Sequence, residues 1–160
     1  MSTRLEILKA PAPILRQKCR TIYAGQFDVD LHNLAGDMLA TAKDARGQGL
    51  AANQVGCDLR LIVVDVRGYP PMSMCNPVID WAKGEEVAKE GCLSIPGIKV
   101  PVKRATKIRV SWRNLAGEAK SGVFVDLIAR CIQHEVDHLD GVLILDYAAE
   151  SERQLLESEP

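Results

Sequence analysis

The sequence has few aromatic residues, almost no net charge and no long apolar run. Aromatic side chains make up 4% of the 160 residues, too few for a surface that stacks nucleic-acid bases. A formal net charge of −1 provides no overall basic footprint for nucleic acid or an anionic membrane. No segment approaches the roughly 20 apolar residues that span a bilayer, and residues 1–20 lack the apolar core of a secretory signal. These absences predict a cytoplasmic protein without nucleic-acid or membrane partners, and we take a monomer as the default.

The cysteines do not form the pattern of a disulfide framework. Their number is odd and they are scattered along the chain, at Cys19, Cys57, Cys75, Cys92 and Cys131. Small secreted domains that depend on disulfides have even numbers of closely spaced cysteines. We therefore expect a reducing compartment, in which a thiol is free to bind metal.

The bulk composition is that of an ordinary globular protein. Apolar residues make up 47% of the chain and charged residues 26%. A chain of this length fits one domain and is long enough to bury a core. We predict a single domain over residues 1–160, with a polar tail from about residue 148 that is frayed.

Hydrophobic periodicity predicts two helices and two clear strands. Residues 27–45 carry apolar side chains at helical spacing, with Asp28 or Asp30 as the N-terminal cap. Residues 126–140 repeat that period, with apolar neighbours on both flanks that indicate a buried helix. Residues 59–66 and 107–112 read as strands.

Weaker signals complete the predicted fold. Residues 73–81 indicate a short strand interrupted by a proline, and residues 142–145 another. Residues 47–54 read as a small-residue loop, residues 84–90 as an exposed polar segment, and Pro96-Gly97 as a turn. The predicted class is α+β, with antiparallel or mixed sheets packed around a central buried helix that carries the sequence HEVDH.

Histidine is scarce, and two of the three histidines lie in one motif. Residues 134–138 read HEVDH, which on a helix places His134 and His138 on the same face, four residues apart. Two neutral imidazoles at this spacing can reach one divalent ion at about 2.0–2.1 Å. Glu135 can approach a water at such a site without being a ligand itself. The remaining histidine, His32, is predicted to lie at the surface of the first helix.

A catalytic metal usually has three protein ligands, so HEVDH needs a partner. Cys92 is the favoured candidate, because Gly91 allows close approach and Pro96 stiffens the segment. Two alternatives stay open. A zinc peptidase would take a downstream carboxylate, from Asp146, Glu150, Glu152 or Glu157. A closed structural zinc module would add a fourth protein ligand, for which His32 is the candidate.

Three separated stretches resemble the signature motifs of the peptide deformylases. These are GQGLAANQ at 47–54, EGCLS at 90–94 and QHEVDH at 133–138. The opening arm, residues 7–16, is also similar, so the resemblance extends from residue 7 to about 147. It implies a metal-dependent hydrolase that removes the N-formyl group from formylmethionine at the start of new polypeptides and releases formate. The partners it implies are N-formylmethionyl peptides and the exit region of the ribosome.

The resemblance also implies a role for particular residues. Cys92, His134 and His138 would bind one divalent metal, commonly Fe²⁺, with Zn²⁺ or Ni²⁺ able to replace it. Glu135 would transfer the proton. The Gln54 side-chain amide and the Leu93 backbone N–H would stabilise the tetrahedral oxyanion.

The resemblance places the substrate contacts around the same centre. Gly49 would offer its backbone to the peptide, with Gln48 beside it. Leu127 and Cys131 would contribute to an apolar pocket for the methionine side chain. Glu90 would also lie at the substrate site and pair with Arg104. Three residues depart from the family pattern: Gln48 replaces an aliphatic residue, Asn53 a frequent proline, and Asp126 a frequent glycine.

Overall fold

The computed structural model describes residues 3–148. Five strands form one antiparallel sheet in the order β1-β2-β3-β6-β7. Their bounds are β1 Gly49–Ala51, β2 Leu61–Val64, β3 Met72–Lys83, β6 Lys107–Arg113 and β7 Ala119–Val125. A second, two-stranded antiparallel sheet pairs β4 (Glu86–Cys92) with β5 (Ile95–Arg104). The α-helices of the described residues are α1 (Val29–Asp44) and α2 (Asp126–Leu139). The predicted α+β class is confirmed, and the strand pairs of the described residues are all antiparallel.

Helix α1 lies within the predicted range 27–45, and its cap is Asp28, one of the two predicted residues. The Asp28 side chain accepts a hydrogen bond from the Leu31 backbone N–H at 3.0 Å, which caps the first turn. Its buried face consists of Leu31, Ala35, Met38 and Ala42, spaced three or four residues apart. This face packs against one side of the sheet at the β1–β2 end, in a cluster that includes Leu61.

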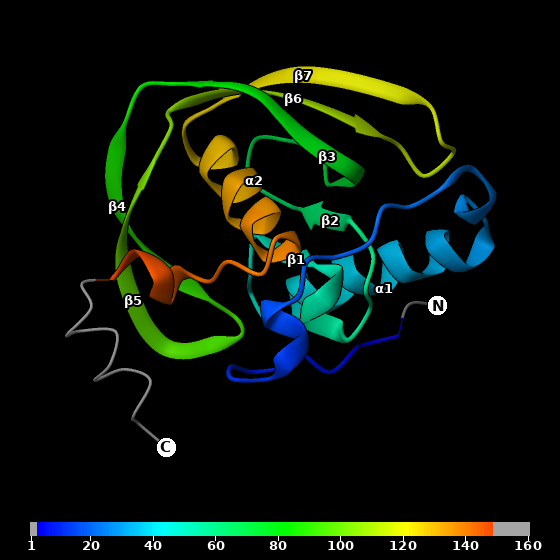
Figure 1. The fold of residues 1–160 in the computed structure, drawn as a ribbon, viewed down its shortest axis with the longest axis horizontal. Coiled ribbons are helices and arrows are strands. Elements are labelled where there is room, and N and C mark those ends of the chain that lie inside the picture. The colour runs from blue at the N-terminus through cyan, green and yellow to red at the C-terminus, as the bar shows by residue number, and fades with distance from the viewer. Residues whose placement is uncertain (1–2, 149–160) are drawn as a thin grey trace.

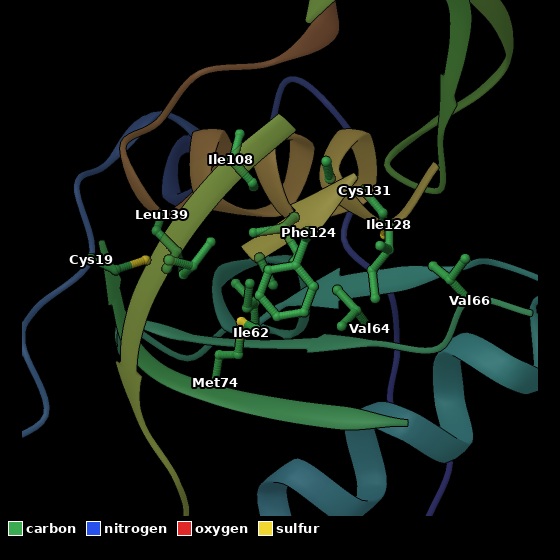
Figure 2. Packing of buried hydrophobic residues seen from close by; sticks show 14 residues of the cluster. Cys19, Ile62, Val64, Val66, Met74, Ile108, Phe124, Ile128, Cys131 and Leu139 are labelled. Carbon is green, nitrogen blue, oxygen red and sulfur yellow. The ribbon is translucent and has the colours of Figure 1, made fainter. Parts of the chain in front are cut away.

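Helix α2 lies in the middle of the molecule and covers the other side of the sheet (Figure 1). Its Ile128 and Ile132 belong to a buried cluster with Ile62 and Val64 of β2 and with Phe124 of β7; most of that cluster is labelled in Figure 2. Because β2 lies between the two helices, all four of its residues are buried. That double burial explains its unbroken apolar sequence.

The β4–β5 hairpin stands apart from the five-stranded sheet, beside α2 (Figure 1). Its own apolar cluster joins Val100 and Val102 of β5 to Leu15 of the N-terminal arm and to residues 143–145. The hairpin is therefore anchored by the two ends of the described chain. This arrangement brings the end of β4 next to α2.

Three sequence-based expectations are wrong in detail, and one strand was not predicted. Residues 84–90 are mostly exposed, as expected, but Glu86–Cys92 form β4, whose backbone pairs with β5. Residues 142–145 pair with no strand of the described chain, and Ile144–Tyr147 form a 3₁₀ turn. The Pro96-Gly97 pair lies inside β5, and the turn occupies residues 93–94. The loop at 47–54 contains β1 and a short 3₁₀ helix, Ala52–Val55.

Three further observations concern Asp126, membrane-spanning helices and the C-terminal tail. Asp126, where a glycine is frequent, has φ of +55°, in the left-handed region that favours glycine. No helix within residues 3–148 is long and apolar enough to cross a membrane. The frayed tail predicted from about residue 148 falls on residues 149–160, which lie outside the described residues.

Candidate active site

Two elements bring the predicted metal ligands together. Cys92 ends β4, and His134 and His138 project from one face of α2. One ligand atom from each residue lies within 4.8 Å of the others, and Cys92 Sγ lies 3.4 Å from His138 Nε2. A tetrahedral ion with ordinary bonds to sulfur and nitrogen separates such atoms by about 3.6 Å. The residues therefore fit a single divalent metal.

The protonation of the two histidines depends on what surrounds each ring. Burial lowers the pKa of His138 well below its usual range, so its ring is neutral, as a metal ligand must be. Burial acts in the same direction on His134, but hydrogen bonds with Cys92 and Glu90 outweigh it and raise its pKa to about 10. In the protein without metal, His134 therefore holds a proton that a metal would displace.

Glu90 is the centre of a buried ionic network behind His134. Its carboxylate accepts two hydrogen bonds from Arg104, at 2.9 and 3.0 Å, and one from Arg130 at 2.6 Å. His134 Nδ1 lies 2.9 Å from the same carboxylate, which leaves Nε2 for a metal. Burial alone would raise the pKa of Glu90, but the bonds from His134 and Arg104 lower it to about 2. Glu90 therefore stays ionised near neutral pH, and its carboxylate orients the His134 ring.

Glu135 is a buried carboxyl without a salt-bridge partner among the described residues. Its Oε1 is buried and has no hydrogen-bond partner there. Burial raises its pKa to about 7, against the opposing charge of His134. A Cβ on Gly49 would lie 2.8 Å from Glu135 Oε2, so this glycine leaves the space that the carboxyl occupies. Such a carboxyl can accept and return a proton near neutral pH.

Gln54 presents an amide N–H to the same centre. Its Oε1 accepts a hydrogen bond from the Ala51 backbone N–H at 2.9 Å, which fixes the orientation of the amide. Its Nε2 then lies 3.0 Å from Ser94 Oγ and 3.9 Å from Cys92 Sγ. The donor is 2% exposed and held in advance, as oxyanion stabilisation requires.

A cavity of about 670 Å³ opens onto these groups. Gln48 and Gly49 line it from the β1 side, and Glu90, Leu127 and Cys131 line it from β4 and α2. It also contains Gln54, Cys92, Leu93, His134 and Glu135, so every substrate residue predicted from the sequence lies at one site.

Within the described residues, neither His32 nor Asp146 joins the metal group. His32 is exposed on α1, and Asp146 is paired with Arg16 at 2.7 Å. The candidate ligand group within residues 3–148 is Cys92, His134 and His138. The tail carboxylates of residues 150, 152 and 157 lie outside the described residues.

Sequence reasoning missed four residues that support the site: Ser94, Arg130, Asp137 and Tyr147. Arg130 lies four residues before His134 on α2 and bonds Glu90, so helical spacing was an available signal. Ser94, two residues after Cys92, contacts Gln54. Asp137 accepts from Arg104 and from the Tyr147 hydroxyl, both at 2.6 Å, and no local pattern indicates that contact.

One cysteine and two histidines close enough to share a divalent ion, beside a buried carboxyl and a fixed amide, are the arrangement of a mononuclear metal-dependent hydrolase. The comparisons identify which one. The family model described as "Polypeptide deformylase" matches residues 4–154. The chain belongs to the polypeptide deformylase family, and it removes the N-formyl group from the formylmethionine of newly made polypeptides in a metal-dependent reaction.

Relatives resemble the chain in sequence and in structure. The peptide deformylase of Dictyoglomus thermophilum is 48% identical over 145 residues, which cover 91% of this chain and 93% of that protein. A crystal structure from Legionella pneumophila matches with a TM-score of 0.91 at 36% identity, over 96% of this chain and 91% of its own. A structure from Acinetobacter baumannii with Met-Ala-Ser bound matches with a TM-score of 0.87 at 34% identity, over 91% of this chain and 99% of its own.

Proposed function

We propose that Cys92, His134 and His138 hold one divalent metal, Fe²⁺ in the cell, with Zn²⁺ or Ni²⁺ able to take its place. The observation that carries this proposal is the approach of the three ligand atoms to within 4.8 Å beside the buried Glu135. Sulfur and imidazole donors suit each of these ions. A bound divalent ion supplies a Lewis acid that makes water nucleophilic near neutral pH.

Glu135 moves the proton in this reaction. Its carboxylate takes a proton from the water that attacks the formyl carbon, and the acid then protonates the departing amine. The C–N bond breaks, formate leaves and the free amino terminus remains. The pKa of about 7, caused mainly by burial, allows both half-steps near neutral pH. Gln54 Nε2 and the Leu93 backbone N–H donate to the oxyanion of the tetrahedral intermediate.

The substrate peptide lies extended in the cavity. Strand β1 is an edge strand of the five-stranded sheet, and β4 pairs with β5 alone in the described residues. Residues of both line the cavity, so an extended peptide can bond to either edge, with Gly49 offering its backbone. Leu127 and Cys131 contact the methionine side chain, and Gln48 borders the same pocket. That a relative is seen with Met-Ala-Ser bound supports a peptide of this type.

The remaining proposals concern the setting of the enzyme. We infer that it acts in the cytoplasm on N-formylmethionyl peptides as they leave the ribosome, and that it is a monomer. Residues 1–160 are proposed to form one catalytic domain. Glu90 borders the cavity, and its direct contact with substrate stays a prediction, because both of its oxygens already accept hydrogen bonds.

Formate release from a short N-formyl-Met peptide tests this function, with protein loaded anaerobically with Fe²⁺. Glu135→Gln keeps the volume of the side chain and should lose about 10²–10⁴ in kcat while binding metal normally. Glu118→Gln, at an exposed turn, is the control and should match wild type. Wild-type activity in Glu135→Gln would refute the proposed proton transfer.

Metal content tests the ligand set separately. Cys92→Ala should lose the metal on dialysis at a chelator concentration at which wild type retains one ion per chain. Full occupancy in that variant would show that the third ligand lies elsewhere, as a zinc peptidase with a tail carboxylate requires.

A further inference from the structure

Three exposed cations line the mouth of the substrate cavity. Arg46 follows the end of α1, Lys89 lies on β4 and Lys99 on β5, so they come from three separate elements. None of them has an ion-pair partner among residues 3–148. Their charges therefore face the cavity and solvent without a carboxylate of the described chain to neutralise them.

The acidic residues of the cavity do not offset these charges. Glu90 and Glu135 are 7% and 4% exposed, so both lie at its inner end. Glu90 is already matched by Arg104 and Arg130, at 2.9 and 2.6 Å. The cavity is thus positive at the mouth, and its negative groups are confined to the reaction centre.

The placement of two of the cations indicates that the side chains themselves matter. Arg46 has φ of +60°, a left-handed conformation that glycine adopts more readily at a helix end. Lys99 lies across the β4 segment before Cys92, since a Cβ on Gly91 would be 3.1 Å from its Nζ. Gly91 thus leaves room for an ammonium group at the cavity wall.

We propose that Arg46, Lys89 and Lys99 form a subsite for acidic side chains of the peptide, so that the enzyme favours substrates with Asp or Glu soon after the formylmethionine. This inference rests on the proposed function, which places the formyl group at the metal ligands and leads the chain outward between β1 and β4. An extended peptide advances about 3.3 Å per residue. The second to fourth residues of the substrate then reach the mouth of the cavity.

The charges act on substrate binding and not on the reacting bond. They contact the peptide equally in the ground state and the transition state, so the preference appears in KM, with kcat unchanged. An exposed ion pair changes affinity by about 1.5- to 5-fold, and salt weakens it because the Debye length falls to about 3 Å at 1 M.

The test compares three formyl peptides whose third and fourth residues are negative, neutral or positive: fMet-Ala-Glu-Glu, fMet-Ala-Gln-Gln, which has the same shape, and fMet-Ala-Lys-Lys. At low ionic strength kcat/KM should fall in that order, with about tenfold between the first and the last. The ratio should shrink towards one at high salt. Equal kcat/KM for the three peptides at low salt overturns the subsite. Absence of formate from all three overturns the proposed function instead.

Variants locate the preference on the protein. Arg46→Gly removes a charge at a position whose backbone suits glycine, and Lys89→Gln removes another. Each should reduce the Glu-to-Lys ratio about two- to threefold through KM. Lys107→Gln is the matched control, since Lys107 is an exposed residue of β6 that does not line the cavity. An equal reduction in Lys107→Gln would assign the effect to net charge and overturn the subsite.

Discussion

The buried Arg104 should contribute more to stability than any exposed ion pair of this protein. Its side chain is 5% exposed and bonds both oxygens of Glu90, at 2.9 and 3.0 Å, and Asp137 Oδ2 at 2.6 Å. Its guanidinium also lies over the Tyr147 ring, with Cζ 4.9 Å from the centroid. Arg104→Met keeps most of the volume and removes every one of these bonds.

The loss in free energy of unfolding depends on which hydrogen bonds Glu90 and Asp137 keep in the variant. Glu90 keeps Arg130 and His134, and Asp137 keeps the Tyr147 hydroxyl, so the buried Glu90 and the half-buried Asp137 each lose part of their hydrogen bonding. Breaking a buried pair in this way costs about 3–5 kcal/mol. The pKa of Glu90, lowered from 4.5 to about 2 by His134 and Arg104 together, corresponds to about 3 kcal/mol at neutral pH, of which Arg104 contributes a part.

The assay is urea unfolding of the metal-free protein at pH 7, with Arg109→Met as the matched control. Arg109 pairs with Asp80 at 3.6 Å and its side chain is 43% exposed, so its loss should cost less than about 1 kcal/mol. The contribution of Glu90 is present above pH 4.5 and is lost as the pH falls through about 2. The difference in free energy of unfolding between wild type and Arg104→Met should therefore become smaller below pH 4.

Equal losses in the two variants would refute this reasoning, because burial would then not decide the value of the pair. A large loss that did not change between pH 7 and pH 3 would refute the part assigned to Glu90. Loading with metal should leave the order of the two variants unchanged, since neither arginine is a ligand.

Three further predictions concern Gly141, Gly36 and Glu135. Gly141→Ala should cost more than about 2 kcal/mol in urea unfolding, because its φ is +75° and a Cβ would lie 2.5 Å from the Arg16 carbonyl oxygen. Gly36→Ala in α1, where a Cβ meets nothing within 4 Å, should instead gain about 0.8–1 kcal/mol, and a loss there would show that helix propensity does not decide stability at this position. Metal-free Glu135→Gln should exceed wild type in stability at pH 8 but not at pH 4. Because burial raises the carboxyl pKa to about 7, its ionisation costs stability as pH rises from 4.5 through 7, and an unchanged difference between the two pH values would exclude that cost.

The fold was predictable from sequence where one side chain pattern decides the structure. Helix α1 has a capping aspartate and an apolar face, and its cap is Asp28, one of the two aspartates predicted for that role. Strand β2 is apolar throughout because helices cover both of its faces. Strand β4 was not predicted, for the opposite reason. It mixes three charged residues with apolar ones in no regular alternation, and it is held by backbone bonds to β5, which no periodicity in 84–90 reveals.

The residues of the functional site were likewise predictable only where a local sequence pattern connects them. Residues that lie four apart on α2 could be paired from the sequence, as His134 and His138 were. Cys92 could only be proposed as a ligand, because its contact with the two histidines depends on how β4 ends beside α2. It lies 42 residues before His134 in the sequence. The Asp137–Tyr147 bond joins α2 to the 3₁₀ turn Ile144–Tyr147, which overlaps the strand predicted at 142–145 and extends beyond it. Long-range polar contacts leave no repeating signal in the chain.

The polar network explains how ligands from two separate elements keep a fixed distance. The hairpin that carries Cys92 has its own apolar cluster, distinct from the one that holds α2 to the sheet. Polar contacts between the hairpin and α2 therefore add to the packing of Leu93 in holding the end of β4 against the histidines. Arg104 of β5 bonds Glu90 of β4 and Asp137 of α2 simultaneously, and Arg130 ties α2 to the same carboxylate. Because Glu90 precedes Cys92 by two residues and also holds His134, one buried anion sets both the ring orientation and the separation of the ligands.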